Sequence, residues 1–126
     1  MENAENKQSR LFLLAGGKYH EREDHIASRL ALLGENLVCA VIMEGLPTAS
    51  LSLSNTKKLT IVRTAPGCLC CIGNLVMRVT LTRLLRLKPD ILFIAIQDAS
   101  HLEGLRTMIA AHDYGALLNL EDVTVF

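Results

Sequence analysis

The amino-acid sequence predicts an α/β fold with a mostly parallel central sheet of about five strands and helices on both faces. Three observations support this fold class. Short, continuous apolar runs recur along the chain, which is typical of strands buried on both faces of a parallel sheet. Amphipathic helical patterns alternate with these runs. Turns that contain glycine or proline separate the two kinds of segment. The expected architecture therefore has three layers, with the sheet in the middle.

The strands are expected where the apolar runs lie, at residues 11–15, 37–43, 59–62, 91–96 and 123–126. Polar or turn-forming residues bound each run. Residues 48–58 are rich in Ser, Thr and Asn, so a loop is expected there.

Three helices are expected between the strands, each with one apolar stripe. The first follows the charged residues 18–24 and ends at Gly34, and its inward residues are Ile26, Leu30 and Leu33. The second covers residues 74–87, with Met77, Leu81, Leu84 and Leu85 inward. The third covers residues 102–112, with Leu102, Leu105 and Ile109 inward, and Asp98 or Ser100 is expected to cap its start.

Length and charge limit the classes of protein to which the chain can belong. A chain of 126 residues has the size of one domain, and we expect a flexible tail at residues 1–10 and a single domain at residues 11–126. The 13 basic and 13 acidic side chains give a net charge of zero, which argues against a nucleic-acid binder or a polybasic membrane anchor. No apolar run approaches the roughly 18 residues of a membrane span. The polar N-terminus lacks the apolar centre of a signal peptide, so the expected location is the cytoplasm.

Three of the four cysteines are crowded into one segment, Gly67-Cys68-Leu69-Cys70-Cys71. In a reducing compartment this favours metal or redox chemistry over a disulfide framework. Three thiolates suit zinc, copper or another thiophilic ion, and a water, a side chain or a second copy of the chain would complete the site. The alternatives are that the three are small buried hydrophobes, or that Cys68 pairs with Cys70 or Cys71. Cys39, inside an apolar run, is expected to be a core residue.

The cysteine segment, placed between a strand and a helix, resembles the Gly-Cys-x-Cys-Cys signature of the CobW-type metallochaperone GTPases, relatives of HypB and UreG. Met43-Glu44-Gly45 resembles a shortened form of that family's Asn-Glu-aromatic-Gly turn. Leu84-Leu85, Pro89-Asp90 and residues 120–126 also fall in the family's order. The resemblance covers most of residues 11–126 and implies a P-loop NTPase-like, Rossmann-like domain that is shorter than the family's.

The nucleotide-binding parts of the family pattern are altered. The family's P-loop reads Gly-x-x-x-x-Gly-Lys-Thr, in which backbone N–H groups and the Lys hold phosphates and the Thr holds Mg²⁺. Here Gly16 matches the first glycine, but Glu21, Arg22 and Glu23 stand at the positions of the last three residues. Two carboxylates facing the phosphates would repel them. On the later strand, Ala95 replaces the acid near Mg²⁺.

Two further family features have no counterpart in this sequence. Asp98 replaces the glycine that senses the γ-phosphate, and no guanine-reading Asn-Lys-x-Asp motif occurs within these 126 residues. The resemblance therefore implies a pseudo-GTPase rather than an enzyme, with no catalytic residues and with GTP not expected as a ligand.

These inferences lead to one leading hypothesis. The chain is expected to be a metal-binding relative of CobW-type metallochaperones, holding a thiophilic ion at Cys68, Cys70 and Cys71 for delivery, storage or regulation. Zinc is the first choice, and copper, cobalt and nickel are alternatives. The expected partners are a second copy in a C2 dimer, or a GTPase or metalloprotein client. The competing hypotheses are a regulatory module that binds such a GTPase or client, and a residual nucleotide-binding protein.

Other polar residues have simpler interpretations. The charged stretch 18–24 reads as a solvated helix start, although His20 or Glu21 would be placed to add a metal ligand. Glu44 follows a strand and is a candidate neighbour of the metal ligands. His112, at a helix C-terminus, and Asp98, at a helix start, are expected to be structural.

Overall fold

The computed structural model describes residues 8–33, 36–47, 53–66, 72–111 and 114–126. Strands and helices alternate along the chain. The strands are β1 (Ser9–Ala15), β2 (Cys39–Glu44), β3 (Leu59–Thr64), β4 (Ile91–Ile96) and β5 (Leu118–Val125). The helices are α1 (Tyr19–Leu33), α2 (Ile72–Leu85) and α3 (Leu102–Ala111), with short 3₁₀ turns η2 (Ala99–His101) and η3 (Tyr114–Ala116) around α3.

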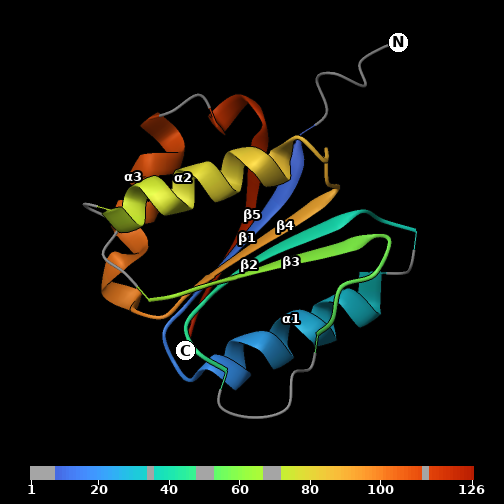
Figure 1. Cartoon of the computed structure of the whole chain (residues 1–126), viewed down its shortest axis with the longest axis horizontal. Helices are drawn as coiled ribbons and strands as arrows, with labels where there is room; N and C mark the ends of the chain where they lie inside the picture. The colour runs from blue at the N-terminus through green and yellow to red at the C-terminus, as the bar shows by residue number, and fades with distance from the viewer. Residues whose placement is uncertain (1–7, 34–35, 48–52, 67–71, 112–113) are drawn as a thin grey trace.

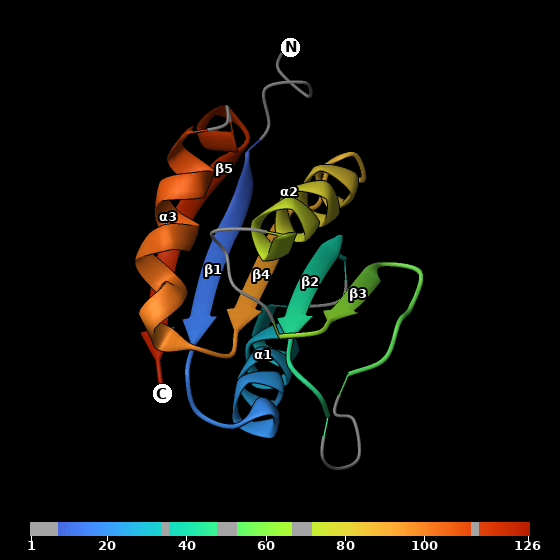
Figure 2. The same cartoon turned by 60° about the vertical axis from the view of Figure 1, so that its left-hand side comes forward.

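The five strands form one parallel sheet in the order β3-β2-β4-β1-β5. Helix α1 covers one face of the sheet, and α2 and α3 cover the other (Figure 1). The expected three-layer, Rossmann-like α/β architecture is thereby confirmed. In the turned view the arrowheads of the strands point to the same edge (Figure 2), which is the carboxyl edge of the sheet.

The hydrophobic core has two halves, one on each face of the sheet, because successive strand residues point to opposite faces. In β1, for example, Leu11 and Leu13 contact the α2–α3 side, whereas Phe12 and Leu14 contact the α1 side. The predicted stripes face inward. Their fully buried members are Ile26 in α1, Met77, Leu81 and Leu84 in α2, and Leu105 in α3.

Strand β5 differs most from the sequence prediction, because it begins at Leu118, five residues before the expected start. Asn119, Glu121 and Asp122 interrupt the apolar pattern there, yet they belong to the strand. They are tolerated because β5 is an edge strand, paired with β1 only, and these side chains are exposed. The other elements lie within two residues of their predicted bounds, apart from the start of the first helix, which was expected after residue 24 and lies at Tyr19.

The order of the strands creates a reversal point between β1 and β4. From β1 the chain runs through α1 towards β2 and β3, and from β4 it runs through α3 to β5 on the other side. The loops after β1 and β4 therefore diverge at the carboxyl edge. Parallel α/β sheets place their ligand sites at such points, so this edge is where a site is sought. None of the helices in the described ranges is long and apolar enough to cross a membrane.

Candidate functional site

The carboxyl edge of the sheet contains a hollow of about 480 Å³. It lies beside the turn after β1, the start of α1 and the segments that follow β2, β3 and β4. Its lining residues are Gly17, Lys18, Tyr19, His20, Arg22, Leu46, Pro66 and Gln97. The turn after β1, where the resemblance would place a phosphate-binding loop, forms one wall of this hollow.

Arg22 organises that turn from inside the protein. Its side chain is 1% exposed. Nη1 donates hydrogen bonds to the carbonyl oxygens of Gly16 (2.8 Å) and Gly17 (2.9 Å), and Nη2 donates to the carbonyl oxygen of Glu44 (3.0 Å). Burial lowers the pKa of the guanidinium, and the nearby Glu44 carboxylate acts in the opposite direction. The carbonyl oxygens of Gly16 and Gly17 are thus hydrogen-bonded to a positively charged side chain of the protein itself.

The carboxylate of Glu21 also bonds to the main chain, at the start of α1. Its Oε1 accepts a hydrogen bond from the backbone N–H of Lys18, at 2.7 Å. Free N–H groups at a helix N-terminus are the donors that bind anions, and side-chain carboxylates are favoured there for the same reason. In this chain the Glu21 carboxylate takes the Lys18 N–H that a bound phosphate would need.

Because Gly16 and Gly17 lack side chains, Glu21 and Phe126 can lie close to the backbone of this turn. Both glycines have positive φ, +85° and +64°, a conformation that favours glycine. A Cβ at position 17 would lie 2.6 Å from the Cβ of Phe126 and 2.7 Å from Oε1 of Glu21. The glycine at this position is therefore explained by the packing of the chain against itself.

Glu23 points away from the turn and joins α1 to β3. It is 2% exposed, its Oε1 lies 2.7 Å from Nη1 of Arg63, and its Oε2 accepts from the backbone N–H of Leu53 at 2.8 Å. Arg63 also donates to the hydroxyl of Tyr19. Burial raises the pKa of that tyrosine, and the contacts with Glu23 and Tyr19 raise the pKa of Arg63 against the effect of burial.

The interpretation of residues 18–24 as a solvated helix start is therefore wrong for three of them. Tyr19, Arg22 and Glu23 are buried, because hydrogen bonds and an ion pair within the protein compensate for their loss of water. The expected pair of carboxylates facing a phosphate is also absent: Glu21 caps the helix start, and Glu23 faces Arg63.

The ends of β2 and β4 are joined by another buried carboxylate. Oε1 of Glu44 accepts a hydrogen bond from the backbone N–H of Gln97, at 2.8 Å. Ala95 is fully buried in the core on the α1 side. Asp98 accepts from the backbone N–H of Ser100 at 2.9 Å, which lowers the pKa of its carboxyl group and confirms it as a cap, here of the turn η2.

The predicted metal ligands Cys68, Cys70 and Cys71 lie outside the described residues. The chain on either side is described: β3 ends at Thr64, Pro66 lines the hollow, and α2 starts at Ile72. Among the residues that the structure describes, no group of three or more His, Cys, Asp or Glu side chains is arranged to hold a metal ion. His20 is exposed and lines the hollow that Pro66 also lines.

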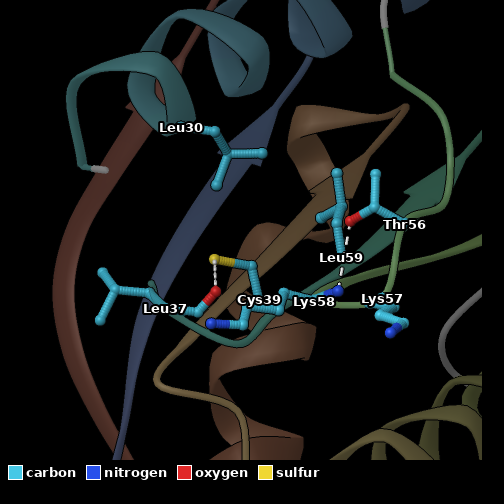
Figure 3. A pocket seen from close by; sticks show the side chains of 7 residues that line it. All are labelled: Leu30, Leu37, Cys39, Thr56, Lys57, Lys58 and Leu59. Carbon is cyan, nitrogen blue, oxygen red and sulfur yellow. Dashed lines mark hydrogen bonds between the residues drawn. The ribbon is translucent and has the colours of Figure 1, made fainter. Parts of the chain in front are cut away.

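Cys39 is a core residue, as predicted. It is 6% exposed, and its Sγ lies 3.8 Å from the carbonyl oxygen of Leu37. Burial raises the pKa of the thiol. It borders a second hollow, of about 480 Å³, at the amino ends of β2 and β3, between Leu30 and the segment 56–59 (Figure 3). This hollow lies at the edge of the sheet opposite the candidate site.

Two more histidines have structural surroundings. The ring of His25 packs edge-on against Phe126, with centroids 5.6 Å apart, and burial lowers its pKa. His101 lies 3.8 Å from the carboxylate of Asp98. His112 lies outside the described residues.

Comparisons with protein-family models, with curated proteins and with solved structures found no match to this chain. The CobW-type resemblance therefore depends on the residues of the sequence alone.

Sequence reasoning did not find the Arg22 network. The sequence shows charged residues at three consecutive positions of the family's P-loop, and from this alone we predict only a loss of phosphate binding. Only the structure shows that Arg22 bonds to the main chain of two turns.

Proposed function

We propose that this chain is a metal-binding pseudo-GTPase related to the CobW-type metallochaperones. In this proposal Cys68, Cys70 and Cys71 bind a thiophilic ion, zinc first, with copper, cobalt and nickel as alternatives. The chain would act in the cytoplasm, where cysteines stay reduced and available as ligands. Its role would be delivery, storage or regulation rather than catalysis.

One observation supports the pseudo-GTPase part most strongly. The guanidinium of Arg22 bonds to the carbonyl oxygens of Gly16 and Gly17 from within the protein. A phosphate-binding turn works by pointing N–H groups at the anion. Here Glu21 already accepts from Lys18 N–H, so a phosphate would have to displace a carboxylate of the chain itself.

The metal-binding part rests on the chemistry of the cysteine segment and on its flanks. Three thiolates within four residues are a donor set that suits zinc or copper. The segment connects the carboxyl end of β3 to the start of α2, the edge at which parallel α/β sheets hold ligands. His20, which lines the same hollow as Pro66, is a candidate fourth ligand, and a second copy of the chain is the other.

Two titrations by calorimetry test the two parts separately. In the first, Zn²⁺ is added to the reduced wild-type chain and to a Cys68→Ser, Cys70→Ser double variant. Binding heat in the wild type and its loss in the double variant are expected. Cys39→Ala is the matched control, because it removes a thiol that lies in the core, and it should bind zinc like the wild type.

In the second titration, GTP and ATP are added with Mg²⁺, and no binding heat is expected for either nucleotide. Saturable binding of GTP would reject the pseudo-GTPase part and leave the metal part standing. If His20 is the fourth ligand, His20→Ala weakens zinc binding. If a second copy completes the site, zinc instead converts monomer to dimer in sedimentation experiments.

A further inference from the structure

Charge is distributed very unevenly along this neutral chain. The 45 residues from Gly45 to Pro89 contain seven of the 13 basic residues and none of the 13 acidic residues. The remaining 81 residues therefore carry all the acidic side chains and an excess of negative charge. Helix α2 lies within the basic segment, and its outer side is part of the molecular surface (Figure 1).

One stripe of α2 combines arginines with exposed apolar side chains. Its members are Leu75, Arg78, Val79, Arg83 and Arg86, the last just beyond the helix end, and we call this set the α2 outer stripe. Their spacing of three or four residues places them on one side of a helix. Leu75 and Val79 are 57% and 47% exposed, so the stripe presents apolar surface beside its arginines.

The α2 outer stripe borders a hollow of about 380 Å³ where α2 passes Tyr114 of η3. The position of Tyr114 is fixed: it is 8% exposed, and its hydroxyl bonds to the side chain of Thr82 (3.0 Å) and to the carbonyl oxygen of Arg78 (3.3 Å). The hollow therefore has a rigid floor, with apolar and cationic walls.

The arginines of this stripe have no acidic partner in the described part of the chain. The arginines that form ion pairs there are Arg10, Arg29, Arg63 and Arg106, and each of these meets a carboxylate. Nε of Arg78 is buried with no hydrogen-bond partner among the described residues. Arg22, whose Nε is likewise without a partner, has both of its terminal nitrogens bonded to main-chain carbonyls, whereas no ion pair to a described carboxylate is found for Arg78, Arg83 or Arg86.

We propose that the α2 outer stripe is a docking surface for an acidic, amphipathic helical segment of a partner protein. The exposed apolar residues select a protein segment with its own apolar side, and the three guanidinium groups select carboxylates over amines. The stripe spans 12 residues from Leu75 to Arg86, or about 16 Å of helix, which matches about three turns of a partner.

A symmetric contact between two copies through this stripe is disfavoured. In a C2 interface each patch meets itself, so arginines would face arginines. A nucleic acid would pair with the arginines but would leave Leu75 and Val79 without apolar contact. A contact of this length belongs to the small, transient class, so we expect weak binding that decreases with added salt.

A nuclear magnetic resonance titration of the ¹⁵N-labelled full chain tests the proposal. The first probe is a synthetic peptide of about 15 residues, long enough to form helix, with Leu on one face and Glu on the other. The second replaces every Glu by Lys, and the third is a duplex DNA oligonucleotide. The Glu peptide is expected to shift the amide signals of residues 75–86 and 114, and the Lys peptide is expected to cause no shift.

Charge reversal on the stripe gives the decisive comparison. Arg83→Glu with Arg86→Glu is expected to weaken binding of the Glu peptide by about tenfold or more. Arg106→Glu is the matched control, since Arg106 is an exposed arginine on α3, and it should bind as the wild type does. Val79→Ser tests the apolar half and should also weaken binding. Unchanged binding in the double variant, shifts elsewhere on the molecule, or tighter binding of DNA than of the Glu peptide would overturn the proposal.

Discussion

Two regions of this molecule use arginine in opposite ways. At the turn after β1, Arg22 is 1% exposed and donates three hydrogen bonds to main-chain carbonyls. On the α2 outer stripe, Arg83 and Arg86 are exposed and have no ion pair with a described carboxylate. The first arrangement holds the turn after β1 to the end of β2 from within the protein. The second contributes little to folding and leaves charge available for binding.

The largest expected effect is the loss of Arg22. Arg22→Met keeps much of the side-chain volume but leaves the carbonyl oxygens of Gly16, Gly17 and Glu44 without their donor. Because an unsatisfied buried polar group costs about 1–3 kcal/mol, we expect a loss of about 3 kcal/mol in the free energy of unfolding. Denaturation with urea measures it.

The matched substitution in the other region is Arg83→Met. Because Arg83 is exposed, the free energy of unfolding of this variant should differ from that of the wild type by less than about 0.5 kcal/mol. Equal losses for Arg22→Met and Arg83→Met would contradict the contrast between the two regions.

The next effect concerns the ion pair between Glu23 and Arg63. A double-mutant cycle with Glu23→Gln and Arg63→Met should give a coupling energy of about 1–3 kcal/mol, because the carboxylate is buried and the two atoms lie 2.7 Å apart.

The exposed pair of Glu103 and Arg106, at 4.0 Å, is the matched control for that cycle. It should give no more than about 0.5 kcal/mol. A coupling for Glu23 and Arg63 as small as that of the control would mean that this network does not hold α1 against β3.

Gly17→Ala should destabilise the protein by about 1–2 kcal/mol, since the new Cβ would contact Phe126 and Glu21 and the residue keeps a positive φ. Gly104→Ala in α3 is the control. Nothing lies within 4 Å of its Cβ position, so alanine there should stabilise the helix by about 0.5–1 kcal/mol. The same sign of change at both positions would contradict the described packing of the turn.

The smallest effect is the titration of His25. Burial lowers its pKa, so the unfolded chain takes up a proton before the folded chain does. Stability is therefore expected to fall as the pH drops through the ordinary range of histidine, and His25→Gln should reduce this fall. The pKa is read directly from the ring resonances, and a value at or above that of free histidine would contradict the structure.

Most of the fold was predictable because apolar periodicity decides it. Residues 91–96 form a continuous apolar run, and the strand β4 has these bounds. Strand β5 was predicted too short, because an edge strand can expose Asn119, Glu121 and Asp122 without cost, and such a strand has no full apolar pattern.

The candidate site was less predictable. The sequence shows that Glu21, Arg22 and Glu23 are charged. Which way each side chain points depends on the side of α1 on which it lies and on the hydrogen-bonding groups within its reach. Hydrogen bonds to main-chain atoms of distant segments, such as Arg22 to Glu44, leave no mark in residue type. The fold of the backbone has to be known before such contacts are visible.

The central claim is that the cysteine segment binds metal while the turn after β1 serves folding only. Elemental analysis of the purified, reduced protein tests it most directly. We predict that the wild type and Cys39→Ala retain zinc or another thiophilic metal, and that Cys68→Ser with Cys70→Ser loses it while remaining folded. Equal metal content in the wild type and the double variant, or a wild type that retains no metal, would contradict the claim.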